Sequence, residues 1–152
     1  MKSCITLSLV PSLKGGPWVL WDDLESGIKQ AANLGFDAIE LFTNGLSIEP
    51  TDQLNQLLSE NNIILGAVGT GAGKVINGLT LTHQNEDIRK KAISYIKDMI
   101  DFGAKYNAPA IIGSMQGSYE GEIGRKQALC WLAEGLEILG QHAQSKGVKL
   151  IY

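Results

Sequence analysis

Residues 35–42 read Gly-Phe-Asp-Ala-Ile-Glu-Leu-Phe, and this stretch combines the two signals that recur along the chain. Gly35 follows an amphipathic segment, and glycine readily adopts the left-handed conformation that ends a helix. The residues after it, 36–42, are mostly apolar, which is typical of a strand that is covered on both faces. A helix followed so directly by a buried strand predicts an α/β fold with a parallel sheet.

The same order of segments continues on both sides of this stretch. Strands are predicted at residues 5–10, 36–42, 63–68, 110–114 and 148–152. Helices are predicted at residues 22–34, from about Thr51, at 85–106 and at 123–145. Asp22 fits the N-cap of the first helix, with Glu25 placed as in a capping box. We therefore expect a parallel sheet covered by helices.

Two architectures fit this pattern. A doubly wound sheet normally closes with a helix over its last strand, whereas here the fifth predicted strand is the last element. This favours a (β/α)8 TIM-barrel type fold truncated to about its first four and a half βα units. In both folds, ligands bind where the long connections at 11–21, 69–84 and 115–122 leave the carboxyl ends of strands.

Composition excludes several other classes. The chain is 44% apolar and 19% charged with a net charge of −3, and no basic stripe suggests nucleic-acid binding. No apolar run reaches membrane-spanning length, and no signal-peptide pattern precedes the first strand. Cys4 and Cys130 suit reduced, buried thiols rather than a disulfide. We expect a cytoplasmic protein that binds neither nucleic acid nor membrane.

The glycine-rich stretch at residues 69–74 fails the spacing of two nucleotide-binding motifs. A phosphate loop needs glycine where Val68 stands and Ser or Thr where Val75 stands, and a dinucleotide fingerprint needs glycine in place of Lys74. The simplest interpretation is a turn that passes close to a pocket or to another backbone. A second interpretation is that its backbone amides hold a sugar hydroxyl or a phosphate.

Glu40 is the most informative polar residue because it interrupts an apolar strand. If Ile39 and Leu41 face the helices, alternation directs Glu40 into the barrel interior. It is then either a polar group on the floor of a pocket or a hydrogen-bonded structural carboxylate, and both interpretations stay open. His83 and His142 form no metal-ligand pattern, and Ser114 lacks the context of a catalytic serine.

Several of these segments resemble one known family. Gly35–Leu41 looks like the second-strand motif of xylose isomerase-like TIM-barrel proteins. Residues 87–92, followed by 100–101 and 108–109, resemble their third helix and fourth strand, and residues 113–117 resemble a strand-four ending of sugar-phosphate isomerases and epimerases. The resemblance covers nearly the whole chain, residues 1–152, as the N-terminal part of such a barrel.

The resemblance implies a parent protein that isomerises or epimerises a sugar or sugar phosphate. Family members typically bind a divalent metal (Mn, Mg, Co or Zn) through a glutamate at the end of strand five and through Asp, His and Glu on later strands. Residues 149–152 resemble the strand that leads to that glutamate, so no catalytic or metal residue is expected in this chain, which should be inactive alone. The residues that match the substrate-facing rim by strand position are Ser8, Glu40, Gly69, Thr70, Ser114 and Met115.

Two alternatives remain at this point: a non-catalytic α/β binding or assembly module, and a doubly wound nucleotide-binding domain. A partial barrel would also leave two sheet edges unpaired and several hundred Å² of apolar inner surface in water, at a cost of about 10 kcal/mol. We therefore expect a homodimer or higher self-association.

Overall fold

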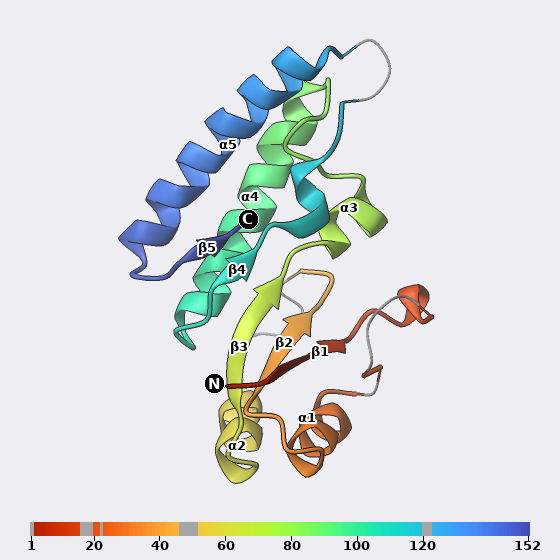
Figure 1. Ribbon diagram of the computed structural model, residues 1–152, viewed down its shortest axis with the longest axis vertical. Helices are drawn as coiled ribbons and strands as arrows, with labels where there is room; N and C mark the ends of the chain where they lie inside the picture. Colours follow the sequence, from red (N-terminus) through yellow and green to blue (C-terminus); the bar gives the residue numbers. More distant parts are fainter. Residues whose placement is uncertain (1, 16–19, 22, 46–51, 120–122) are drawn as a thin grey trace.

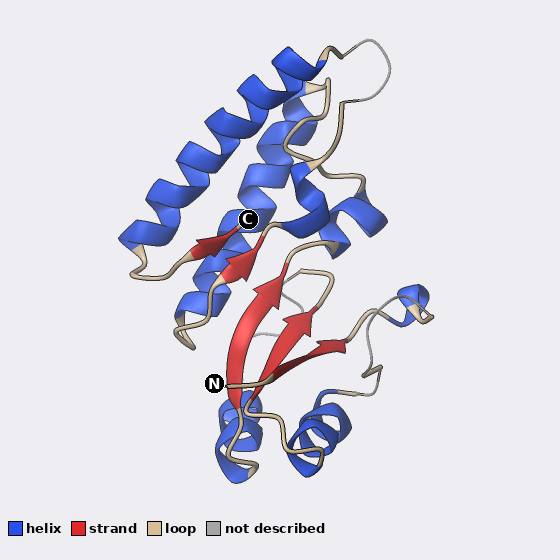
Figure 2. Ribbon diagram, in the orientation of Figure 1, coloured by secondary structure: helices blue, strands red, loops and turns tan. Residues whose placement is uncertain are grey.

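The computed structural model describes residues 2–15, 20–21, 23–45, 52–119 and 123–152. Its strands are β1 (Cys4–Ser8), β2 (Ala38–Phe42), β3 (Ile64–Gly69), β4 (Ala110–Ile111) and β5 (Leu150–Ile151). Its helices are η1 (Pro11–Leu13), α1 (Leu24–Asn33), α2 (Asp52–Glu60), α3 (Ala72–Asn77), α4 (Glu86–Ala104), η2 (Gly113–Gln116) and α5 (Arg125–Ser145). The predicted alternation of strands and helices is confirmed (Figure 2).

The five strands form one sheet in the order β1-β2-β3-β4-β5, and every neighbouring pair is parallel. Figure 1 shows the strands following one another across the sheet without a reversal. A doubly wound sheet reverses its strand order near the middle. The observed order is therefore that of a barrel, and the doubly wound alternative is wrong.

The helices pack against one face of this sheet. Ile39 and Leu41 of β2 are fully buried in a cluster with Ile28 of α1 and Leu54 of α2. A second cluster joins Ala110 of β4 to residues of α4 and α5, among them Ile100 and Leu139. Strand residues alternate between two faces, so the intervening residues point away from the helices. This opposite side is called the inner face below.

The first helix begins one residue later than predicted. Asp23 is its N-cap, and the Asp23 side chain accepts a hydrogen bond of 3.0 Å from the backbone N–H of Ser26. The predicted cap, Asp22, lies outside the described residues, as does Thr51 at the predicted start of α2. Gly35 ends α1 as expected, with a left-handed φ of +82°.

Two connections at the carboxyl ends of strands differ from expectation. The glycine-rich segment after β3 was predicted as a turn and contains the short helix α3. The fourth strand was predicted at 110–114, yet β4 ends at Ile111 because the backbone is helical at Ile112 and continues into η2. Thr70 Oγ1 donates hydrogen bonds to the carbonyls of Ile111 (2.9 Å) and Ile112 (3.0 Å), which holds this turn against β3.

Both cysteines are free thiols and both are exposed, so the expectation of buried thiols is wrong. Cys4 sits on the first strand of an open sheet, and Cys130 falls on the outer side of α5. None of the described helices is long and apolar enough to cross a membrane.

Candidate functional site

The inner face carries small and polar side chains near the carboxyl ends of β1 to β3. Thr6 and Ser8 of β1 are in register with Glu40 and Phe42 of β2. Glu40 in turn is paired with Ala67 of β3, after an irregularity in the register between Ile39 and Glu40. The apolar inner surface on these strands is smaller than expected because most of their large aliphatic residues face the helices, although Ile64 of β3 is 48% exposed.

Glu40 is the carboxylate at the centre of this face. The strand alternation predicted its direction, and the structure confirms it. Its Oε2 accepts a hydrogen bond of 2.8 Å from Thr6 Oγ1 on the neighbouring strand. Its Oε1 lies beside Gly69, where a Cβ atom would stand only 2.7 Å from that oxygen. Half-buried Glu40 is thus oriented by one neighbour and accommodated by the missing side chain of another.

Ser8 stands at the carboxyl end of β1 and is almost fully buried, with 2% of its surface exposed. Its Oγ accepts a hydrogen bond of 3.4 Å from the backbone N–H of Val10. The Ser8 backbone N–H donates to the carbonyl of Leu20 at 3.0 Å, which brings the end of the first connection back to β1. Ser8 therefore lies near Glu40 in the sheet but already has an internal hydrogen bond.

Thr70 and Met115 are fully buried beneath the same edge of the sheet. The Thr70 hydroxyl is directed to two carbonyls of the β4 turn, as described above. Met115 packs in the second core cluster, and its sulfur would stand 2.6 Å from a Cβ placed on Gly73. These two side chains support the connections at the rim from below.

Ser114 is exposed and lies close to Gly71, where a Cβ atom would meet Ser114 Oγ at 3.1 Å. The same position would meet the Phe42 ring at 3.1 Å. The structure therefore brings Ser114, the glycine turn and the end of β2 together at the carboxyl edge of the sheet. Of the six rim residues taken from the sequence, Glu40, Gly69 and Ser114 border this area most directly.

Sequence reasoning missed Thr6 and Phe42. Thr6 matters because it is in register with Glu40, and no pattern in the sequence reveals the register of two strands. Phe42 was read only as the end of an apolar strand, yet it is buried against Val10 and Ala72 beneath the glycine turn. The alternation that directs Glu40 to the inner face also directs Phe42 there, so this signal was available.

The described residues do not assemble a site for a divalent metal. No group of three or more His, Cys, Asp or Glu side chains gathers anywhere in the part of the chain that the structure describes. On the inner face of the described strands, Glu40 is the one carboxylate, and one of its oxygens already accepts a bond from Thr6. An octahedral ion requires more oxygen ligands than this. No metal-dependent step can be derived from these residues.

Comparison with known proteins agrees with the observed fold. Residues 28–152 match the family model of the xylose isomerase-like TIM barrel. The chain belongs to this family. No curated protein matches the chain.

Solved structures of sugar epimerases have the same fold. D-psicose 3-epimerase from Clostridium cellulolyticum H10, solved with D-tagatose, is similar with a TM-score of 0.69 and 21% identity over 99% of this chain and 51% of that one. A D-tagatose 3-epimerase-like protein has a TM-score of 0.71 and 19% identity, again over 99% and 51% of the two chains. L-ribulose 3-epimerase has a TM-score of 0.68 and 13% identity, over 99% and 48%. At these identities the similarity shows the fold alone.

The chain therefore spans about half the length of the solved structures that it matches. Its five parallel strands, with the packed helices on one face, correspond to part of a TIM barrel. The carboxyl edge that carries Glu40, Gly69 and Ser114 is the edge at which TIM-barrel enzymes place their active sites.

Proposed function

We propose that residues 1–152 form the N-terminal part of a sugar or sugar-phosphate isomerase or epimerase and supply part of its substrate-binding floor. The observation that carries the proposal is the Thr6–Glu40–Gly69 arrangement on the inner face. A carboxylate that is fixed by one neighbouring hydroxyl and left accessible by a glycine is suited to accept hydrogen bonds from the hydroxyls of a sugar. The family match and the fold of the ketose epimerases support the same substrate class.

The reaction itself is assigned to the whole barrel. Enzymes of this kind move a proton between neighbouring sugar carbons, and the resemblance implies a divalent metal, Mn, Mg, Co or Zn, for the complete protein. In our proposal the metal ligands and the acid–base pair come from parts of the barrel that this chain does not contain. The chain alone is then inactive, and its own residues bind and orient the substrate.

Each rim residue has a distinct part in this proposal. Glu40 accepts hydrogen bonds from sugar hydroxyls, and Ser114 offers a hydroxyl at the same edge. Gly69 keeps the space beside Glu40 open. Ser8, Thr70 and Met115 are buried and position the strand ends that surround the substrate. A cytoplasmic location, with a sugar rather than nucleic acid or membrane as partner, completes the proposal, and the two free cysteines support it.

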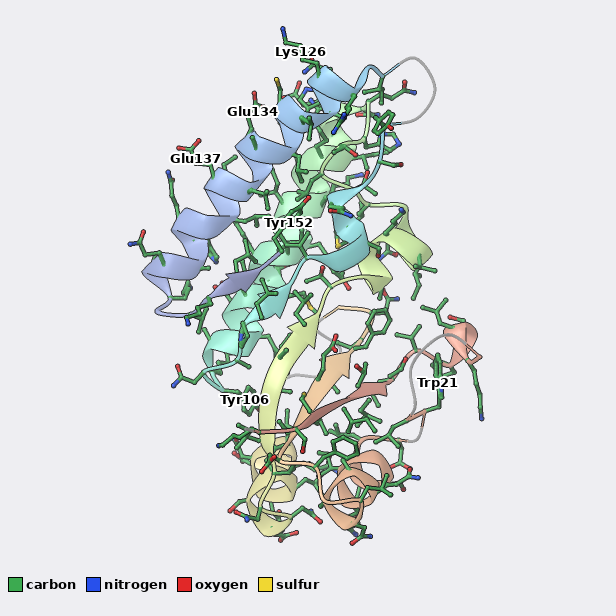
Figure 3. All side chains as sticks on the ribbon, in the orientation of Figure 1. Trp21, Tyr106, Lys126, Glu134, Glu137 and Tyr152 are labelled. Atoms are coloured by element: carbon green, nitrogen blue, oxygen red, sulfur yellow. The ribbon has the colours of Figure 1, made fainter. Side chains whose placement is uncertain are left out.

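Titration of the 152-residue chain with D-tagatose, D-psicose and D-fructose, followed by amide NMR, tests the proposal. We expect shifts at Thr6, Glu40 and Gly69, with weak affinity because only part of the barrel is present. Glu40→Gln should weaken this binding. Glu137→Gln is the matched control because Glu137 is exposed on α5 and points away from the sheet (Figure 3). Absence of shifts on the inner face with all three sugars would contradict the proposal.

A further inference from the structure

A hollow separate from the inner face lies among the connections at the carboxyl ends of β3 and β4. The connection after β3 runs through α3 to α4, and the connection after β4 runs through η2 to α5 (Figure 1). Between them is a pocket of about 380 Å³. Its polar lining residues are Lys74, Thr80, Thr82, His83, Gln84 and Ser118. This volume is within the range of small-molecule sites.

Direct contacts between the two connections hold this pocket in shape. The backbone N–H of Leu81 donates to the carbonyl of Met115 at 2.9 Å, and Thr82 Oγ1 donates to the carbonyl of Ser118 at 2.8 Å. Gly117 has a left-handed φ of +84°, and a Cβ atom there would collide with the side chain of Thr82. Glycine at this position therefore permits the close approach of the two connections.

The orientation of His83 follows from a backbone contact. The N–H of Asn85 donates to His83 Nδ1 at 3.0 Å, so Nδ1 is the acceptor nitrogen of the neutral ring. The ring proton then resides on Nε2, which is a donor. His83 lines the pocket, and its half-buried imidazole carries this N–H donor.

Arg89 of α4 holds the backbone that follows the His83 ring. One guanidinium nitrogen donates to the carbonyls of His83 at 2.7 Å and Gln84 at 3.1 Å. The guanidinium also stacks over the Trp131 ring of α5, 4.1 Å from its centroid. Such a stacked arginine is held in one geometry, so it acts as a positioning residue for the wall of the pocket.

The described lining residues supply mainly hydrogen-bond donors and one positive charge. Lys74 contributes an ammonium group, His83 an N–H, Thr80 a hydroxyl and Gln84 an amide. None of the described residues that line the pocket is acidic. This combination matches an anion with several acceptor oxygens, and the volume leaves room for a carbon chain beside it.

We propose that this pocket binds a phosphoryl group and that Lys74 and His83 are its principal contacts. The attribution of the phosphoryl group to a sugar phosphate rests on the proposed function of the inner face. The anion site itself does not depend on that function, and free phosphate shares the same chemistry.

Amide NMR titrations of the 152-residue chain with inorganic phosphate, D-fructose and D-fructose 6-phosphate test this proposal. We expect saturable shifts at Thr82, His83 and Ser118 with inorganic phosphate and with D-fructose 6-phosphate. Lys74→Met should weaken phosphate binding by about fivefold, the scale of one solvent-exposed ion pair. Lys74 is exposed, so this variant retains the core packing.

Lys105→Met is the control because it removes the same charge at the C-terminal end of α4, a helix about 28 Å long at 1.5 Å per residue, whereas His83 of the pocket precedes its N-terminal end. No saturable shifts up to about 20 mM phosphate, or equal weakening by the two lysine variants, would overturn the anion site. If D-fructose 6-phosphate binds no more tightly than inorganic phosphate, the assignment to a sugar phosphate is overturned. If phosphate binds here while the free sugars leave the inner face unchanged, this site is supported and the proposed function fails.

Discussion

Thr6 Oγ1 donates a 2.8 Å hydrogen bond to Glu40 Oε2 between register-paired positions of β1 and β2. The bond joins two strands on the face that is not covered by helices. A hydrogen bond to a carboxylate also fixes the direction of that group. The same contact is therefore relevant both to the stability of the sheet and to the geometry of the candidate site.

Replacement of Thr6 by valine should remove this bond while preserving the shape of the side chain. We expect the free energy of unfolding to fall by about 1 kcal/mol, the typical net value of one hydrogen bond. Urea denaturation followed by circular dichroism measures the change. Thr6→Ser retains the hydroxyl and should lose less, so equal losses in the two variants would contradict a role for the bond.

Gly69→Ala should disturb the candidate site, because the new Cβ would stand 2.7 Å from Glu40 Oε1 and 3.0 Å from Cδ2 of Phe42. We expect displaced Glu40 resonances and a lower melting temperature. Gly140→Ala in α5 is the control, since a Cβ there meets nothing within 4 Å and alanine is the better helix former by about 1 kcal/mol. A Gly69→Ala variant as stable as wild type, with unchanged Glu40 resonances, would show that the space is not needed.

The direction of Glu40 followed from the sequence because it rests on simple periodicity, whereas the periodic pattern alone fitted two strand orders. Ile39 and Leu41 are apolar and Glu40 is not, so alternation alone assigns the two faces. The end of α1 was also predictable, since the left-handed Gly35 has a direct signature in the sequence.

The connections were less predictable because their structure depends on contacts between distant segments. α3 forms in a glycine-rich stretch that has little helix propensity of its own, and it packs against η2. The hydrogen bonds from Thr70 to the β4 turn join residues about forty positions apart. No local pattern reveals either contact, and the pocket beside Lys74 is a product of the same long-range packing.

Asp101 links α4 to the end of α5 and should make stability depend on pH. Its Oδ1 lies 2.7 Å from His142 Nε2 and 3.0 Å from Lys146 Nζ. Desolvation opposes ionisation of the carboxyl, but the hydrogen bonds from Lys146 and His142 outweigh it and lower the pKa of Asp101. The folded state therefore binds fewer protons than the unfolded state, so this stabilisation is full above the unfolded pKa of about 4 and is lost as pH falls.

Asp101→Asn tests this pH dependence, with the stability of variant and wild type compared by thermal melts at pH 6 and pH 3. Because Asp101 is substantially exposed, we expect the substitution to lower the free energy of unfolding by less than about 1 kcal/mol at pH 6. At pH 3 the stability of the variant should be closer to that of wild type. Asp98→Asn, on an exposed position of the same helix, should show a smaller change at both pH values. A constant difference between wild type and Asp101→Asn at both pH values would rule out the linkage.

Metal binding by the chain should be weak. The described residues provide no cluster of ligands, and a single carboxylate cannot hold an octahedral ion. Calorimetric titration with Mn²⁺ or Mg²⁺ should show at most millimolar binding, and no sugar should be isomerised in the presence of either ion. Tight one-to-one Mn²⁺ binding would contradict this and would place a ligand set within the chain.

Self-association remains a prediction, although its expected cause changes. The inner face of β1 to β3 carries mainly small and polar side chains beside Phe42 and Ile64, and the edge of β1 is partly covered by a bridge between Leu7 and Leu20. Exposed apolar residues gather instead around a pocket of about 350 Å³ between the end of β5 and α5, which Tyr119, Leu129 and Tyr152 line. Figure 3 shows Tyr152 at the end of the short β5 strand.

We therefore expect a dimer that forms through this apolar side of the molecule rather than through a shared barrel interior. Tyr119, Leu129 and Tyr152 are each more than half exposed, and covering apolar surface contributes about 25 cal/mol per Å². The unpaired edge of β5 can add backbone hydrogen bonds to a second copy.

Sedimentation at micromolar concentration should detect dimers of wild type and monomers of a Leu129→Glu, Tyr152→Glu double variant. Leu34→Glu is the control because Leu34 is similarly exposed, at 59%, at the end of α1. A wild-type monomer with a cooperative melt, or dissociation caused equally by Leu34→Glu, would show that this surface does not mediate association.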